Sequence, residues 1–177
     1  MKTPRSVKYI RGRTENLLQE AGVSSIPVPL HSIADYLGVS IKYHPYEGEL
    51  AGMIARTAQG AVVGINSLHP RTRQRFTLAH ELGHFLLHSF DVHIDTGFRV
   101  KRRDGTSSLA VDPEEIEANR FAAELLMPFS RVLDDLIERD IDIESDEDIR
   151  ILADRYQVSR QAMSIRISNL IDTHRNT

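Results

Sequence analysis

Thr-Leu-Ala-His-Glu-Leu-Gly-His-Phe-Leu-Leu-His, residues 77–88, is the stretch that constrains the fold of this chain most. Its apolar spacing predicts a helix with Pro70 in the first turn, where the missing proline N–H costs nothing. His80 and His84 are four residues apart, so a helix projects both from one face, and two such imidazoles can bind one metal ion. Glu81 lies beside them and can take a proton from a water molecule that the metal activates. The stretch therefore predicts a helix with one apolar face for a core and one face for a catalytic metal site.

A catalytic zinc site needs a third protein ligand, and the second predicted helix, which runs from residue 112 to about 127, offers candidates. Glu115 and Asn119 begin a stripe that is otherwise small or apolar, so this stripe should face inward. A second stripe is polar and should face water: Glu117, Arg120 and Glu124. We therefore predict Glu115 as the third ligand, with Asn119 as a hydrogen-bond partner that orients a ligand.

Two alternatives for this helix remain open at the level of sequence. Asp112 followed three residues later by Glu115 also has the form of a capping box, in which Glu115 would only cap the helix. Glu117, on the same predicted helix, is the other candidate for the third ligand.

The rest of the chain predicts a small α+β fold. Residues 14–20 and 30–37 have helical patterns, and three short strands follow, which suggest a small antiparallel sheet (39–43, 53–56 and 61–65). Residues 91–111 show no period and carry a basic cluster, so we expect a long loop there. Helices are expected at 129–138, 146–156 and 160–171, and Ser145 to Asp148 has the form of a capping box.

Length and composition limit the number of domains, the compartment and the class of partner. The chain has 177 residues, which suits one domain, and we expect a core at 1–128 with a helical extension at 129–177 packed on the same domain. It has no cysteine, no long apolar run and no signal-like start, so a cytoplasmic protein is expected. The net charge of −3 gives no reason to expect nucleic acid as a partner.

The motif residues resemble the ImmA/IrrE family of metallopeptidases. The resemblance is carried by RQRFTLAHELGHFLLH at residues 73–88 and by EIEANRFAAELLMP at residues 115–128, and the predicted strands before them look similar. It spans roughly residues 25–128. It implies a zincin-like fold, in which a small antiparallel or mixed sheet packs on the active-site helix.

The same resemblance implies a site and a substrate class. One zinc ion would be held by His80, His84 and Glu115, with Glu81 as the general base. The substrate would be a helix-turn-helix repressor of a mobile element or stress regulon, cleaved at one peptide bond. No fused repressor or sensory domain fits in this length, so the substrate would be a separate chain and membranes would have no part.

Two mechanistic details are left as hypotheses. An oxyanion needs a helper group, for which His88, His93 and His44 are the candidates. An edge strand of the sheet could pair with an extended, locally unfolded substrate segment.

The tail supports a competing function. Residues 152–167 resemble a helix-turn-helix, although Gln157 stands where the turn usually has glycine. Residues 134–148 hold nine acidic residues and one arginine, a field that repels DNA phosphates. The alternative is therefore a module that binds a repressor or DNA without cutting, as one half of a toxin–antitoxin-like pair, and direct DNA binding is the weaker part of it.

Overall fold

The computed structural model describes residues 3–58, 60–95 and 112–175. In these residues the chain forms, in order, α1 (Val7–Glu20), α2 (Leu30–Tyr36), β1 (Val39–His44), β2 (Gly52–Thr57), β3 (Gly60–Asn66), α3 (Arg71–Leu87), β4 (Val92–Asp95), α4 (Pro113–Leu126), α5 (Phe129–Glu138), α6 (Asp146–Tyr156) and α7 (Arg160–Arg175). The fold is α+β, as the sequence predicted, and its small sheet beside the motif helix is consistent with the zincin-like fold that the resemblance implied.

The sheet is mixed, with the order β1-β3-β2-β4. The β2–β3 hairpin is antiparallel, but β1 pairs with β3 in parallel, so the simple antiparallel picture of the first three strands was wrong. The reason is burial. β3 is the most buried strand and takes an inner position, with β1 on one side and β2 on the other, and β1 runs in the same direction as β3.

The strand β4 forms where the sequence predicted part of a long loop. Residues 91–111 were expected to form a long loop, but residues 92–95 pair antiparallel with β2 and form an edge of the sheet. Val92, His93, Ile94 and Asp95 are too few for a two-residue period to stand out, and the strand forms because β2 offers an open edge. The basic cluster and the remainder of the expected loop, residues 96–111, lie outside the described residues.

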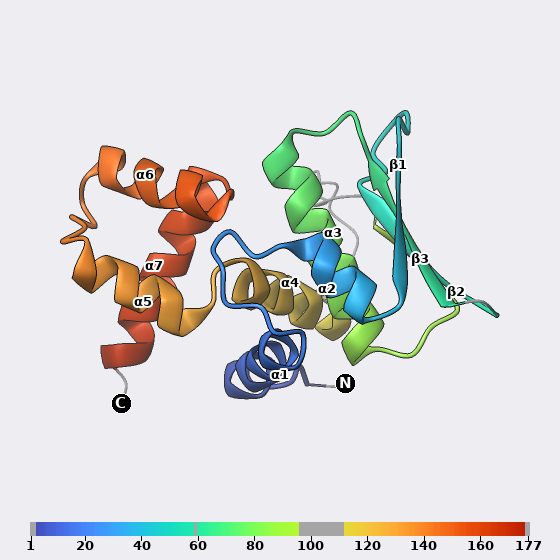
Figure 1. Ribbon diagram of the computed structural model, residues 1–177, viewed down its shortest axis with the longest axis horizontal. Coiled ribbons are helices and arrows are strands. Elements are labelled where there is room, and N and C mark those ends of the chain that lie inside the picture. The colour runs from blue at the N-terminus through green and yellow to red at the C-terminus, as the bar shows by residue number, and fades with distance from the viewer. Residues whose placement is uncertain (1–2, 59, 96–111, 176–177) are drawn as a thin grey trace, which may run out of the picture.

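Helix α3 lies between the sheet and α4, and it is covered on both sides (Figure 1). Leu78 and Leu82 are fully buried, whereas Phe85, on the face predicted to be apolar, is only partly buried. Gly83 permits the close approach of α4, because a Cβ atom there would lie 3.1 Å from Phe121 Cδ1 and 3.2 Å from Ala118 Cα. The helix therefore holds the motif residues in the interior between two layers.

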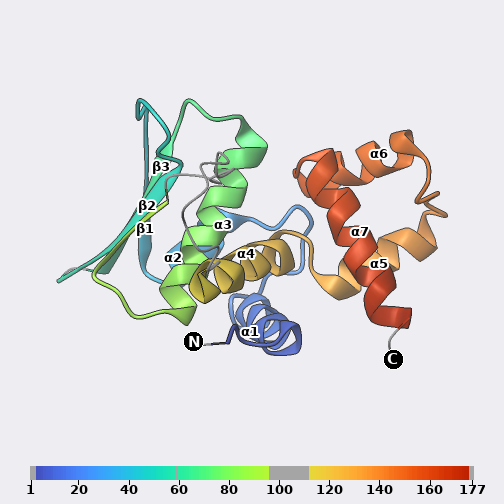
Figure 2. The same ribbon diagram turned by 180° about the vertical axis from the view of Figure 1, so that it is seen from behind.

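Helices α5, α6 and α7 gather at the end of the molecule opposite the sheet, with α4 between them and α3 (Figures 1 and 2). Buried ionic contacts attach them: Arg166 of α7 donates to both carboxylate oxygens of Glu124 on α4, at 2.9 and 2.6 Å. Gln157 ends α6 in the left-handed conformation, with φ 53°, which glycine would adopt at lower cost. None of the helices described by the structure has the length and apolar character to cross a membrane.

Candidate metal centre

Three predicted ligands come together where α3 meets the first turn of α4. The Nε2 atoms of His80 and His84 are 3.0 Å apart. Glu115 Oε2 lies 3.4 Å from His80 Nε2, and Glu115 Oε1 lies 3.2 Å from His84 Nε2. Both histidines are buried, whereas the Glu115 side chain is 36% exposed. A group of two imidazole nitrogens and a carboxylate, open on one side, is the donor set that zinc takes in catalytic sites.

The first residues of α4 show whether Glu115 caps the helix or is available as a metal ligand. Asp112 is the N-cap, and its side chain accepts from the backbone N–H of Glu114 at 2.9 Å. The Glu115 side chain points instead to the histidines. The helix is therefore capped without Glu115, whose carboxylate remains available to a metal ion.

Each of the two histidines also contacts a neighbour through its second ring nitrogen. His80 Nδ1 lies 3.0 Å from Asn119 Oδ1, so the amide oxygen accepts a hydrogen bond from this nitrogen. His84 Nδ1 lies 3.0 Å from Nδ1 of His88. Because Asn119 can only accept through its oxygen, His80 keeps the proton on Nδ1 and presents a lone pair on Nε2, as a metal ligand must.

Glu81, beside His80 in α3, is fully buried. Its Oε2 atom lies 3.2 Å from His93 Nδ1, while Oε1 has no hydrogen-bond partner in the part of the chain that the structure describes. Burial raises the pKa of Glu81, although the hydrogen bond from His93 opposes this shift. A buried carboxylate oxygen without a partner costs free energy, and it suits a group whose partner is a bound water or metal.

The strand β2 keeps Glu81 covered on the side of the sheet. A Cβ atom on Gly52 would lie 2.5 Å from Thr77 Cγ2, 3.1 Å from the carbonyl oxygen of Gly64 and 3.5 Å from Glu81 Oε1. The strand can therefore press against α3 at this point only with glycine.

His93 enters the site from β4, and the other two candidates for the oxyanion helper do not. Its Nε2 lies 3.0 Å from Glu115 Oε1, and its ring stacks on that of His84 with centroids 3.6 Å apart. Burial opposes a charge on His93, but the hydrogen bonds to Glu115 and Glu81 outweigh it and raise the pKa to about 10. His44 is exposed and packs edge-on against Tyr46.

His88 does not occupy the position of an oxyanion helper. Its side chain is buried behind His84, and its Nε2 lies 3.1 Å from Glu117 Oε2. A substrate on the open side of the metal group would not reach it. Helical spacing predicted that His88 lies on the same face of the helix as His84. It could not predict which positions along that face are exposed and which are buried.

The polar stripe of α4 was predicted to face water, and this prediction was wrong. Glu117 is fully buried and pairs with Arg5, and Glu124 is buried and pairs with Arg166. The physical reason is that the N-terminal segment and α7 pack on this face and bring Arg5 and Arg166, so each carboxylate is buried with a partner. Periodicity reports polarity and does not report such pairing.

Electrostatics favour the ligand forms of Glu115 and His84 but oppose the neutral, ligating form of His80. Hydrogen bonds from His80, His84 and His93 hold the pKa of Glu115 far below its usual range. Burial lowers the pKa of His84, so that its imidazole stays neutral more readily. For His80 burial acts in the same direction, but the carboxylates of Glu115 and Glu81 outweigh it and raise the pKa. Asp95 of β4 completes a second acidic grouping with His80 and Glu81.

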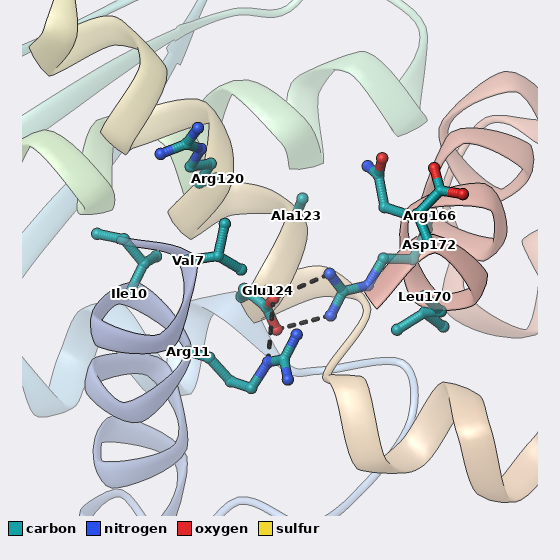
Figure 3. Close-up of a pocket in the computed structure, with 10 residues that line it drawn as sticks. Val7, Ile10, Arg11, Arg120, Ala123, Glu124, Arg166, Leu170 and Asp172 are labelled. Atoms are coloured by element: carbon teal, nitrogen blue, oxygen red, sulfur yellow. Dashed lines mark hydrogen bonds and ion pairs between the residues drawn. The ribbon is translucent and has the colours of Figure 1, made fainter. Parts of the chain in front are cut away.

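A cavity elsewhere in the molecule shares no residue with this group. It has a volume of about 420 Å³ and lies between α1, α4 and α7 (Figure 3). Figure 3 shows the Glu124 carboxylate at its centre, held by Arg166 and by Arg11. Because its central charges already satisfy one another, we assign the chemistry to the histidine group.

Comparisons with known proteins show similarity to a family, to a phage protein and to a solved structure. The family model described as the IrrE N-terminal-like domain, a peptidase family, matches residues 34–168. An uncharacterized immunity region protein 2 of Bacillus phage phi105 is 31% identical over 98 residues, which are 55% of this chain and 58% of that protein. A solved structure, a Mycobacterium tuberculosis transcriptional regulator, is similar in fold with a TM-score of 0.54 and 14% identity, over 88% of this chain and 45% of that one.

Proposed function

The chain belongs to the peptidase family of the IrrE N-terminal-like domain, and from this membership we propose that it is a zinc-dependent endopeptidase with a protein substrate. The family supports a metallopeptidase-like role in general. The observation that carries the proposal for this chain is the convergence of His80, His84 and Glu115, next to a buried carboxylate oxygen of Glu81 that has no protein partner among the described residues.

In this proposal His80, His84 and Glu115 hold one zinc ion. When bound, zinc supplies Lewis-acid chemistry, which acidifies a water molecule and polarises the scissile carbonyl. Glu81 accepts a proton from the attacking water as the new C–O bond forms, and it passes that proton to the amine nitrogen as the C–N bond breaks. Its raised pKa brings it closer to neutral pH, where a group can both accept and return a proton.

His93 is the group that we propose for stabilising the oxyanion. It lies at the open side of the site, where its Nε2 is 3.0 Å from Glu115, and its side chain is 21% exposed. A protonated imidazole at this position can donate to an oxygen that gains negative charge.

The strand β4 supplies a surface for the substrate. It lies at an edge of the sheet and carries His93 in its middle, paired with Ile54 of β2. An extended peptide that added to this edge would run past His93 with its backbone hydrogen-bonded to the strand. We therefore propose that the substrate binds in extended form along β4.

We further propose that the substrate is a helix-turn-helix repressor on a separate chain, cut at one peptide bond. The phage relative is named for an immunity region, and the similar solved structure is a transcriptional regulator. The name of the solved structure points to transcription control as the setting. The chain spans 58% of the phage protein and 45% of the regulator, so their activities and partners enter here only as part of the proposal.

The tail favours a second candidate, a module that binds a repressor without cutting it. Helices α6 and α7 meet through a turn in which Gln157 has the left-handed conformation that the turn of a helix-turn-helix requires. The exposed side chains before and on α6 include Glu144, Asp146 and Glu147, which oppose binding to DNA. This second candidate has no use for Glu81, and that residue separates the two.

The test is a cleavage assay with the zinc-loaded wild type and the Glu81→Gln variant. Each is incubated with purified helix-turn-helix repressors from the same genomic neighbourhood, and the products are identified by mass spectrometry. We expect one new peptide bond cleaved by the wild type, no cleavage by Glu81→Gln, and equal zinc content in both. Equal biological activity of the two proteins, without cleavage by either, would refute the peptidase and support the binding module.

A further inference from the structure

Both of the proposed histidine ligands make a second contact through Nδ1, but with different partners. His80 donates from Nδ1 to the side-chain oxygen of Asn119, which lies on α4. His84 instead meets a second histidine, with 3.0 Å between its Nδ1 and Nδ1 of His88. A histidine can either accept or donate there, so His88 fixes the proton on His84 only if something fixes the proton on His88.

Glu117 provides that constraint. Its Oε2 lies 3.1 Å from His88 Nε2, and its side chain is 1% exposed. Arg5 donates to the same carboxylate twice, from its backbone N–H to Oε1 at 2.7 Å and from its guanidinium to Oε2. With an arginine bound to both oxygens Glu117 is ionised, and an ionised carboxylate only accepts. The nitrogen of His88 that faces Glu117 must therefore carry a proton.

The proton positions then follow along the chain of contacts. A neutral His88 with its proton on Nε2 has a lone pair on Nδ1, and that lone pair accepts from Nδ1–H of His84. A neutral His84 with its proton on Nδ1 has a lone pair on Nε2, the atom that lies 3.2 Å from Glu115. This is the form in which an imidazole ligates a metal through Nε2.

We propose that Arg5, Glu117 and His88 are positioning residues, which fix the orientation and the proton of His84 so that its Nε2 is ready for the metal ion. The inference rests on the proposed function only in taking His84 as a ligand. It assigns a task to the N-terminal segment, since Arg5 precedes α1 and joins the site to α3 and α4. Arg5 also donates to the carbonyl of Leu87 at the end of α3, and its own carbonyl accepts from Arg120 of α4.

Glu117→Gln is the variant that tests the chain of protons. A glutamine has nearly the same shape, but its amide places an NH₂ group against a donor whichever way it is turned. At the position of Oε2 the NH₂ group would face His88 Nε2–H and Arg5; at the position of Oε1 it would face the backbone N–H of Arg5. In the first orientation the proton of His88 is no longer held on Nε2. In the second orientation an amide oxygen still faces His88, but the contact with the backbone of Arg5 is lost and the negative charge that holds the proton on Nε2 is gone.

Glu124→Gln is a matched control. Glu124 lies on the same helix, is also a buried glutamate and also pairs with arginines, Arg166 and Arg11. It contacts no histidine in the interactions that the structure describes. A general loss of packing or of a buried ion pair affects both variants, whereas an effect on His84 belongs to Glu117 alone.

The experiment measures zinc affinity by competition with a chelating dye, and the protonated ring nitrogens of His84 and His88 by long-range ¹H–¹⁵N spectra of the zinc-loaded proteins. We expect Glu117→Gln to bind zinc about 10- to 100-fold more weakly than the wild type, as changes of such outer partners do. We expect Glu124→Gln to stay within about two-fold of the wild type, well below that range. In the wild type the spectra should show a proton on Nε2 of His88 and on Nδ1 of His84.

Arg5→Met is the second variant, in case Glu117→Gln fails to fold. It keeps the apolar stem and the backbone N–H but removes the guanidinium, so it should weaken zinc binding in the same direction. Equal zinc affinity of the wild type and both positioning variants, or a proton on Nδ1 of His88 in the wild type, would overturn the inference. A wild type that binds no zinc would instead overturn the metal site on which it rests.

Discussion

At the scale of single residues, His93 connects the two carboxylates on which the proposed reaction depends. Its Nδ1 contacts Glu81 and its Nε2 contacts Glu115. In the protein without metal these contacts raise the pKa of His93 to about 10, so the ring carries a positive charge at neutral pH. The charge compensates two carboxylates that would otherwise face each other in a half-buried site.

We expect His93→Asn to keep about one zinc per chain, because the three ligands remain. Turnover should fall by about 10²- to 10³-fold, the usual cost of removing one oxyanion donor. Zinc content and turnover on the same preparation check this. His44→Asn, at the exposed end of β1, is the control and should match the wild type. Loss of zinc together with His93 would make His93 a ligand and contradict the assigned role.

The sequence alone was enough to predict that His80, His84 and Glu81 lie together on one helix, because their spacing is local. It also pointed to Glu115, although part of the reasoning was wrong. Glu117 and Glu124 were expected in water but are buried, paired with Arg5 of the N-terminal segment and with Arg166 of α7. Such pairing joins residues far apart in the sequence, by 112 positions for Arg5 and Glu117 and by 42 for Glu124 and Arg166, and no local pattern shows it.

At the scale of elements, the crossing of α3 and α4 builds the site. α3 carries the histidines and α4 carries Glu115, so the distance between the two helices sets the distance between the ligands. Gly83 lies at the contact, where Phe121 and Ala118 leave no room for a Cβ atom without adjustment. Adding a Cβ atom at position 83 therefore tests whether the packing of α3 against α4 sets the positions of the metal ligands.

We expect Gly83→Ala to destabilise the fold by about 1–3 kcal/mol through overpacking, less a gain of up to about 1 kcal/mol in helix propensity. Zinc binding should weaken as well, because the helices move apart. Gly12→Ala in α1 is the matched control, since a Cβ atom there meets nothing within 4 Å and only the helix propensity changes. Urea unfolding and zinc titration measure both effects. A Gly83→Ala protein as stable as Gly12→Ala would contradict the tight crossing.

The helices could be predicted from sequence more fully than the sheet. The expected helix at 129–138 coincides with α5, and the expected helix after Pro70 coincides with α3 within a residue. The strand β4 was missed, and with it the position of His93, because four residues carry too little periodicity. The parallel pairing of β1 with β3 depends on which strand is most buried, a property of the whole sheet.

At the scale of the whole molecule, buried charges hold α5 to α6 and attach α7 to α4. The division of the chain at residue 128 stays a prediction. Asp135 of α5 accepts from Tyr156 and Arg155 of α6 and from Arg139, at 2.7–2.8 Å. Burial raises the pKa of Asp135, but these donors outweigh it and hold the pKa below its ordinary value of 3.8. The stabilisation is therefore complete above pH 3.8 and is lost as the pH falls through the lower, folded-state value.

We expect Asp135→Asn to lower the free energy of unfolding by about 1–3 kcal/mol at pH 7, with solvent screening of the half-exposed arginines favouring the low end. The difference from the wild type should shrink below pH 3.8, because Asp135 then loses its charge. Urea unfolding at several pH values measures this. Asp154→Asn on the exposed face of α6 serves as the control. A difference that stayed constant down to pH 2 would show that the charge is not what holds α5 to α6.

The measurement that tests the metal centre most directly is the zinc content of the purified chain by elemental analysis. It is made on the wild type, on Glu115→Ala and on Glu114→Ala, which changes the neighbouring glutamate of the same helix turn. About one zinc per chain is expected in the wild type and in Glu114→Ala, and almost none in Glu115→Ala, since zinc loses one of three protein ligands. Equal zinc in all three would contradict Glu115 as a ligand. No zinc in any of them, even after zinc is added, would contradict the metal centre and with it the peptidase.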